Sequence, residues 1–254
     1  MGLQVRTIDN ADDVVEAAPQ QYPWGITVLL FLAPGAITTA FTLLTASFFQ
    51  QHGLPASLGL DVSPVVVLEI GYLYFLGIRR NGRLSLAGVV GYRRRMPALR
   101  LAVVVAVLFL VGAGIYLALA PVSDYIHTTL FAWMPTALSG GTENSGRSVG
   151  VLLIVLGTNF LLNGFVTPMV EELYFRGHLL PRMPVAGWMA IVVNAALFSI
   201  QHFWQPELYL LVFLLQVINI TALTRLRDLR LPILLHSLLN IAGAVLTLGA
   251  TLGR

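Results

Sequence analysis

The side chains best suited to chemistry in this sequence are carboxylates, two imidazoles and an amide in its last third. Glu171 and its neighbour Glu172 are followed by His202, and then by His236 and Asn240. A carboxylate can take a proton from water, an imidazole can orient that water or protonate a leaving amine, and the remaining donors can stabilise an oxyanion. If these side chains meet, they can hydrolyse a peptide bond without a covalent intermediate.

The two adjacent glutamates are expected to have different roles. Successive residues of an α-helix point about 100° apart, so the two carboxylates should not reach the same target. Glu172 and Arg176 form an i to i+4 pair in the favourable order, which predicts that Arg176 neutralises Glu172 and that the pair holds the local structure. Glu171 is then the chemically available carboxylate.

The elements that must position these residues are membrane helices. The chain has 254 residues, of which 57% are hydrophobic and 11% charged, and its mean hydropathy is +0.80. This composition excludes an ordinary soluble domain. A spanning helix needs about 20 mostly apolar residues, and the sequence contains seven candidates: 24–49, 62–78, 98–120, 148–170, 185–203, 207–224 and 231–252. The predicted fold is an all-α, polytopic transmembrane bundle of about seven spans with a central polar cavity.

The chain divides into three parts on this interpretation. Residues 1–23 form a polar cytoplasmic segment, residues 24–147 form the first membrane helices and their loops, and residues 148–252 form the catalytic bundle. In the loop 121–147, apolar residues from Val122 to Trp133 recur at three- and four-residue steps, which predicts an amphipathic helix on the membrane surface. The stretch 139–146 is typical of a flexible hinge.

Polar residues form stripes on each of the last four predicted spans. In the fourth they recur every four residues, so they share one helix face that cannot point to lipid. The stripes are Asn159, Asn163, Thr167 and Glu171 in the fourth span, Asn194, Phe198 and His202 in the fifth, Gln216 and Asn219 in the sixth, and His236 and Asn240 in the seventh. The four strips are predicted to face a common cavity.

A different role is open for the amides of these stripes. Asn and Gln in membrane helices often form interhelical hydrogen bonds worth about 0.6 to 2 kcal/mol each, and most of the Asn and Gln residues here fit that role better than catalysis. Glu69, in the second span, is either paired with Arg100 or protonated, and it is not assigned to the site. Pro168, three residues before Glu171, either bends the fourth helix beside the carboxylates or ends it.

The arginines indicate how the chain crosses the membrane. All 15 cationic side chains are arginine, and with a cytoplasmic N-terminus they divide 13 to 2 between the two sides. Only Arg147 and Arg254 fall outside, so the positive-inside rule predicts a cytoplasmic N-terminus and an external C-terminus. The exclusive use of arginine is typical of a GC-rich bacterial genome, and we expect an integral protein of a bacterial cytoplasmic membrane.

Three short strings resemble the motifs of a known protease family. The strings are EELYFR (Glu171 to Arg176), FSIQH (Phe198 to His202) and HSLLN (His236 to Asn240). In this order on three successive spans, they resemble the type II CAAX prenyl protease and bacteriocin-processing family, the abortive-infection family of intramembrane glutamate proteases. The resemblance covers residues 148–245, and the first three spans match the family only in character.

The resemblance implies a role for each matching residue. Glu171 would be the general base, His202 would help to activate water, and His236 and Asn240 would bind the oxyanion. Glu172, Arg176 and Phe198 would be structural parts of the site. The eukaryotic branch of the family removes the last three residues of prenylated CAAX proteins, so the implied partner is a peptide or protein, lipid-modified or not, within the lipids of the membrane.

Other functions were weighed on the same residues. The chain has no cysteine, which excludes thiol proteolysis, and no His-Glu-x-x-His motif. We expect no cofactor and no metal, although a zinc-dependent hydrolase using Glu171, His202 and His236 remains open on ligand type. A non-catalytic immunity or scaffold protein that binds a peptide is a second alternative. No basic segment is interleaved with aromatics, so nucleic acid is not an expected partner.

The predicted site places one geometric demand on the helices. Drawn as upright rods, His202 and His236 lie at different depths in the membrane. They converge if the fourth helix continues through Glu171 to about Leu180, if the fifth is tilted, and if the turn from Phe203 to Pro206 is recessed. We predict that arrangement, with His202 within about two hydrogen-bond lengths of Glu171.

Overall fold

The computed structural model describes residues 19–138 and 147–252, and within these ranges the chain is helical with no strand. The predicted all-α membrane bundle is confirmed. In chain order the elements are α1 (Trp24–Gln51), α2 (Leu58–Asp61), α3 (Val65–Asn81), α4 (Ala98–Leu130), η1 (Thr136–Leu138), α5 (Val149–Thr158), η3 (Asn159–Val166), α6 (Thr167–Glu171), η4 (Glu172–Leu179), η5 (Leu180–Arg182), α7 (Gly187–Ile200), η6 (Pro206–Leu208), α8 (Tyr209–Leu226) and α9 (Arg230–Leu252).

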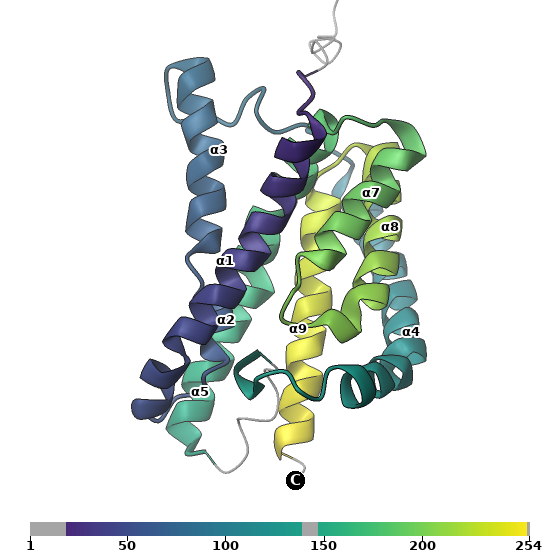
Figure 1. Ribbon diagram of the computed structural model, residues 1–254. Helices are drawn as coiled ribbons and strands as arrows, with labels where there is room; N and C mark the ends of the chain where they lie inside the picture. Colours follow the sequence, from purple (N-terminus) through teal and green to yellow (C-terminus); the bar gives the residue numbers. More distant parts are fainter. Residues whose placement is uncertain (1–18, 139–146, 253–254) are drawn as a thin grey trace, which may run out of the picture.

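Helix α9 lies at the centre of the bundle (Figure 1). It packs against α4 and α8 on one side and against the segment from η3 to α6 on the other. Helices α7 and α8 form a hairpin, and α1 runs across the bundle in contact with α7. The three strings noted in the sequence therefore lie on helices that meet at the centre of the molecule.

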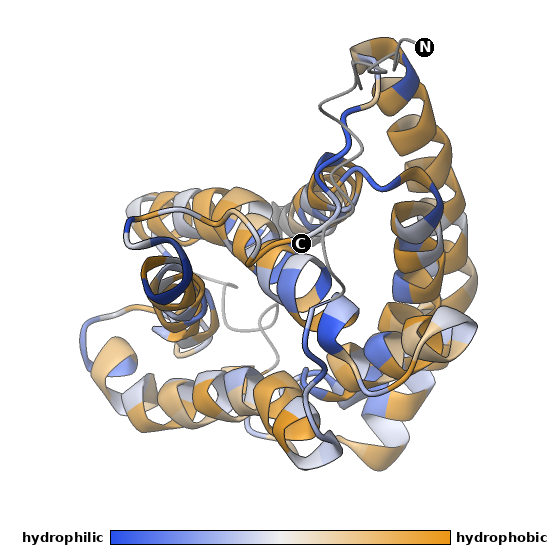
Figure 2. Cartoon of the chain, turned by 90° about the horizontal axis from the view of Figure 1, so that it is seen from above, coloured by the Kyte–Doolittle hydropathy of each residue, from blue (hydrophilic) through white to orange (hydrophobic). Residues whose placement is uncertain are grey.

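The apolar helices differ in length from the predicted spans. Within residues 19–138 and 147–252, five helices are long and apolar enough to cross a membrane: Trp24–Gln51, Leu58–Asn81, Ala98–Leu130, Val149–Arg182 and Pro206–Leu226. Gly187–Ile200 and Arg230–Leu246 are shorter apolar helices. At 14 residues, α7 is about 21 Å long, less than the roughly 30 Å of a hydrocarbon core. Apolar residues cover most of the helices (Figure 2).

The predicted surface helix after residue 121 is the last part of α4. The helix runs without interruption from Ala98 to Leu130 and contains Pro121. Tyr125 and Leu130 remain exposed, as the amphipathic pattern predicts, while the His127 imidazole lies 3.7 Å from the carboxylate of Glu207. The predicted hinge at 139–146 lies outside the described residues.

The core lies behind the three strings noted in the sequence, where α1, η4 and α7 pack together. The rings of Phe31 and Phe175 are 5.2 Å apart, and Phe175 meets Phe198 edge to face at 5.0 Å. Helix α1 also passes very close to the end of α7, since a methyl group added at Gly35 would overlap the carbonyl oxygen of Gln201. The backbone around residue 201 is therefore fixed by α1.

The start of α9 is fixed by Asp228. Its carboxylate accepts hydrogen bonds from the backbone N–H groups of Met96 (2.8 Å) and Arg230 (3.1 Å), and from the Arg230 guanidinium. Leu229 N–H donates to the carbonyl of Tyr92 at 3.0 Å. These contacts join the arginine-rich loop to the first turn of α9 and set the position of His236 along that helix.

Candidate active site

A cavity of about 960 Å³ lies between the helices and brings together the predicted catalytic residues. Glu171, His202, His236 and Asn240 all line it, and so does Phe198. The whole polar stripe of the fourth span lines it too: Asn159, Asn163 and Thr167 together with Glu171. Glu172 and Arg176 are fully buried beside the cavity and do not line it.

The helix that carries Glu171 is continuous but irregular. It runs from Val149 to Arg182 as predicted, yet α6 is only five residues long and lies between the π-helical segments η3 and η4. Pro168 lies at the start of α6 and cannot donate a backbone hydrogen bond, which suits a change of helix type at this point. π-helical turns inside α-helices are frequent at functional sites.

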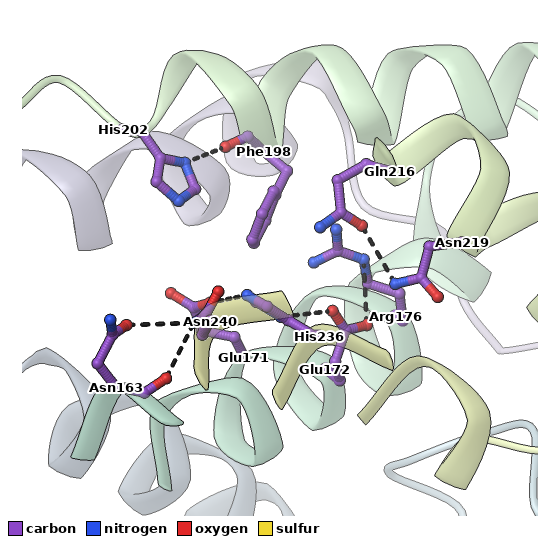
Figure 3. Close-up of polar contacts among 10 residues, drawn as sticks. All are labelled: Asn163, Glu171, Glu172, Arg176, Phe198, His202, Gln216, Asn219, His236 and Asn240. Carbon is purple, nitrogen blue, oxygen red and sulfur yellow. Dashed lines mark hydrogen bonds and ion pairs between the residues drawn. The ribbon is translucent and has the colours of Figure 1, made fainter. Parts of the chain in front are cut away.

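His236 lies between the two glutamates. Its Nδ1 is 3.0 Å from Oε1 of Glu172, and its Nε2 is 3.9 Å from Oε2 of Glu171 (Figure 3). The first distance is a hydrogen bond, whereas the second is only an ion-pair distance. A Glu172 carboxylate accepts from Nδ1–H, so Glu172 orients the ring and directs Nε2 to Glu171 and the cavity.

The expectation that the two carboxylates serve separate targets was therefore wrong. Both reach His236, because the imidazole has a nitrogen atom on each side of the ring and each glutamate approaches a different one. Glu171 is the last residue of α6, and Glu172 is the first residue of the π-helical η4. Glu172 has a second function besides its contact with Arg176.

Arg176 is a buried cation held by one carboxylate and aromatic rings. Its Nε lies 3.4 Å from Oε2 of Glu172, and its guanidinium carbon lies 3.8 Å from the ring centre of Phe198. Among the described residues, no hydrogen-bond partner reaches its three nitrogen atoms. The predicted pairing of Glu172 with Arg176 is present, and Phe198 stacks on the cation.

His202 is oriented by the backbone of the same helix. Its Nδ1 lies 2.8 Å from the carbonyl oxygen of Phe198, so Nδ1 carries the proton and donates it. Nε2 is left as the nitrogen that can accept a proton or a water hydrogen. His202 shares the cavity with Glu171, but no direct contact between the two is found in the described part of the chain.

Asn240 is occupied by a neighbouring helix. Its amide nitrogen donates to the backbone carbonyl of Asn163 at 2.9 Å and to the Asn163 side-chain oxygen at 3.1 Å. Both of its N–H groups are thus engaged within the protein (Figure 3). An oxyanion could receive a hydrogen bond from Asn240 only after one of these contacts opens.

The comparison with protein families agrees with the motifs. Residues 153–242 match the family described as type II CAAX prenyl endopeptidase Rce1-like. This segment is similar to the Rce1-like family. The match confirms the resemblance drawn from the three strings, and it contains all four candidate catalytic residues. No curated protein and no solved structure matches the chain.

The matched Rce1-like segment covers α5 to most of α9, and α1 to α4 lie outside it. Two acids from those first helices nevertheless lie near the site. Asp61 lines the cavity, and its carboxylate accepts a hydrogen bond from Asn159 at 3.0 Å. Glu69 is 3% exposed, and neither of its carboxylate oxygens has a hydrogen-bond partner among the described residues. The pairing of Glu69 with Arg100 is not found.

Two further polar residues support the site from behind. Asn194, predicted on the stripe of the fifth span, donates to the carbonyl of Phe175 at 3.2 Å and so joins α7 to η4. Gln201, the fourth residue of FSIQH, is 1% exposed and next to His202. Gln201 is part of the string FSIQH, but the sequence alone does not predict that Gln201 is buried, because its burial depends on the packing of α1 against the end of α7.

The ligand types considered for zinc do not form a cluster. Within the described ranges, no group of three His, Cys, Asp or Glu side chains is arranged to hold a metal ion. Glu171 and His236 are adjacent, whereas His202 lies beside Phe198 and faces them from the opposite side (Figure 3).

Proposed function

We propose that the protein is an intramembrane endopeptidase in which Glu171 activates water for attack on a peptide carbonyl. The observation that supports this most is the cavity, because an acid, two imidazoles and an amide line one space inside an apolar bundle. A carboxylate placed there is a functional-site hypothesis by default, since charges in a membrane interior are costly. The family match adds a peptidase class to that chemistry.

The proposed reaction is a direct hydrolysis. Glu171 takes one proton from water, Nε2 of His202 accepts a hydrogen bond from the O–H that remains, and the resulting hydroxide oxygen forms a bond to the carbonyl carbon. The C–N bond of the tetrahedral intermediate then breaks, and the proton held by Glu171 passes to the leaving amine. The products are a new carboxyl group and a new amine, and no covalent enzyme intermediate is needed.

His236 and Glu172 are proposed to act on the developing oxyanion. Glu172 accepts from Nδ1–H of His236, and this fixes the ring so that Nε2 faces the reacting atoms. In its protonated form His236 donates Nε2–H to the oxyanion, while Glu172 balances the charge of the ring. Asn240 adds a second donor if it leaves Asn163, with which it is bonded in this structure.

The proposed substrate is a peptide or protein that enters the bundle from the membrane or its surface. The cavity is large enough for several residues, and apolar side chains from α4, α8 and α9 form much of its wall. A lipid-modified substrate fits such a wall as well as an apolar peptide does. Membrane lipids cover the outer faces of the helices.

Substrate trapping tests the proposal. Glu171→Gln protein, purified in detergent micelles, is incubated with a peptide library, the bound peptides are identified by mass spectrometry, and each is then incubated with the wild type. We expect the wild type to cut the trapped peptides at one bond and Glu171→Gln to leave them intact. Peptides that bind both proteins equally and are never cut would favour the non-catalytic scaffold.

A chelator distinguishes the metal-free reaction from the zinc-dependent alternative. The proposed mechanism predicts that o-phenanthroline leaves the rate of cleavage unchanged. A rate that falls with the chelator and returns on addition of zinc would replace this mechanism with a metal-assisted one.

A further inference from the structure

The cavity extends far beyond Glu171, in one direction only. Along the helix from α5 to α6 its lining begins at Leu152 and ends at Glu171. On α3 it includes only Val65 and Val66, at the start of the helix, and on α9 it runs from Leu235 to Leu246. The space therefore continues from Glu171 to α2, where the loop after α1 meets the start of α3.

The far part of the cavity contains one acid and several hydroxyl groups among apolar side chains. Asp61 at the end of α2 lines it together with the hydroxyl residues Thr38, Ser57 and Ser63. Thr38 and Ser63 are hydrogen-bonded to each other at 2.9 Å, and the carboxyl group of Asp61 is the ionisable side chain in this part of the lining. Its Oδ1 accepts from the side-chain amide of Asn159 at 3.0 Å.

Within residues 19–138 and 147–252, no positive side chain balances this acid. Of the described residues, Asp61 and Glu171 are the carboxylates that line the cavity, and no arginine among them is part of its wall. In the described part of the chain, Asp61 forms no ion pair. A carboxylate taken from water into a protein wall is costly unless an opposite charge or several donors compensate, and one amide is a weak compensation.

The distance between the two acids fits an extended peptide. Asn159, which bonds Asp61, precedes Glu171 by 12 residues on one continuous helix. At 1.5 Å per residue this is at most about 18 Å, or about five residues of an extended chain at 3.3 to 3.6 Å each. A substrate backbone lying along the helix could thus place one bond at Glu171 and a side chain at Asp61.

We propose that Asp61 binds a positively charged side chain of the substrate, about four to six residues from the bond that Glu171 cleaves. This inference rests on the proposed peptidase function and adds a substrate class to it: peptides with an arginine or lysine at that spacing. The carboxylate of Asp61 supplies the negative charge, and Asn159 orients the carboxylate. Because the described lining around Asp61 contains no cation, the positive side chain of the substrate would be its counter-ion.

Pairs of peptides test this inference. The two peptides of a pair differ at one position, where one has arginine and the other has citrulline. Citrulline has nearly the same shape as arginine but no charge. Across the set of pairs, this position moves from three to seven residues away from the scissile bond, on either side of it. We measure kcat/KM for each pair with the wild type, Asp61→Asn and Asp61→Glu. The matched control is Glu207→Gln, because Glu207 is an acid close to α8 that does not line the cavity.

At one position four to six residues from the cut, the wild type should prefer arginine over citrulline by about tenfold, mainly through KM. The ratio should fall close to one in Asp61→Asn and stay high in Asp61→Glu and Glu207→Gln. If Asp61→Asn does not fold, Asp61→Ser takes its place. Equal rates for arginine and citrulline at every position, or a preference that survives loss of the charge, would overturn the inference.

A binding measurement separates this inference from the peptidase proposal. The same fluorescent peptides are bound to Glu171→Gln and to Glu171→Gln/Asp61→Asn, and Kd is measured by anisotropy. Even if the wild type cuts no peptide, the cation site would be supported if Glu171→Gln binds the arginine peptide with a Kd about tenfold lower than that of the citrulline peptide and Glu171→Gln/Asp61→Asn does not. Equal Kd values for the two peptides in Glu171→Gln would reject it, and Asp61 would then be only an interhelical hydrogen-bond acceptor for Asn159.

Discussion

At the residue scale, His236 connects the two glutamates of the site. Its two nitrogen atoms face Glu172 and Glu171, and Glu172 also contacts Arg176. A single buried chain of contacts therefore links the cation that stacks on Phe198 to the carboxylate in the cavity. The position of each member depends on the others, and removing one would leave a buried charge unpaired.

Asp228 provides a pH-dependent contribution to stability outside the membrane helices. Burial opposes its ionisation, but hydrogen bonds from the Arg230 side chain and from the N–H groups of Met96 and Arg230 outweigh that effect, so the pKa of Asp228 lies below its usual value of 3.8. The stabilisation is then complete above pH 3.8 and is lost as the pH falls through the lower folded-state pKa.

Asp228→Asn is expected to lower the free energy of unfolding at neutral pH by about 1 to 2 kcal/mol, because Arg230 loses its counter-ion and α9 loses its cap. Denaturation in detergent, followed by circular dichroism, measures the change. The difference from the wild type should shrink as the pH falls below 3.8. Asp124→Asn, on the exposed end of α4, is the control and should change nothing. A difference that is the same at pH 3 and pH 7 would contradict this account.

The sequence predicted residues that the structure brings to one cavity, but not all of their partners. The strings and the stripe point to Glu171, His202 and His236, because residue type and helical spacing can be read from the sequence alone, and the catalytic roles of these residues stay predictions. The bonds of Asn240 to Asn163 and the burial of Glu69 depend on how separate helices pack, and no local pattern contains that information.

At the element scale, the long helix with Glu171 was predicted and its irregularity was not. Its continuation past Glu171 to about Leu180 was predicted because His202 and His236 could not otherwise converge on the site, and Pro168 does not end the helix. The π-helical segments η3 and η4 lie on either side of α6, which begins with Thr167 and Pro168, and no pattern in the sequence predicts them. Helix α7 begins at Gly187 and ends at Ile200, so it is shorter at both ends than the predicted span 185–203.

The contact of α1 with α7 is predicted to control the position of His202. A methyl group at Gly35 would overlap the carbonyl oxygen of Gln201, so Gly35→Ala must push apart two backbones. We expect a loss of about 1 to 3 kcal/mol in stability, and a fall of tenfold or more in kcat, because His202 follows Gln201 directly.

Gly25→Ala is the matched control, since it lies in the same helix with no atom within 4 Å of an added methyl group. Thermal unfolding and peptide cleavage are measured for both variants. Equal activity of the two proteins would show that the approach of α1 does not set the position of His202.

At the scale of the whole molecule, the cavity extends away from a group of arginines at one end of the bundle. The lining residues lie towards the end that contains α2 and the start of α5, whereas Arg79, Arg80, Arg182 and Arg225 lie at the other helix ends. The sequence predicted the distribution of arginines, but not that the cavity extends away from them, because its extent depends on the packing of α4, α8 and α9.

The predicted orientation places the N-terminus in the cytoplasm, and single cysteines test it because the chain has none of its own. We expect His52→Cys, in an exposed loop next to α1, to react with a membrane-impermeant maleimide in intact cells. Arg83→Cys, also exposed, should react only after the cells are permeabilised. The opposite labelling pattern would reverse the orientation and place the α2 end of the cavity on the cytoplasmic side.

The most direct test of the central claim compares two buried acids on one cleaved peptide. Glu171→Gln and Glu69→Gln each replace a carboxylate by an amide of the same shape, but only Glu171 lines the cavity. With the protein in liposomes, kcat/KM should fall by about 10²- to 10⁴-fold for Glu171→Gln, as expected for loss of a general base, and stay within a few-fold of the wild type for Glu69→Gln. Full activity of a folded Glu171→Gln protein would contradict the account.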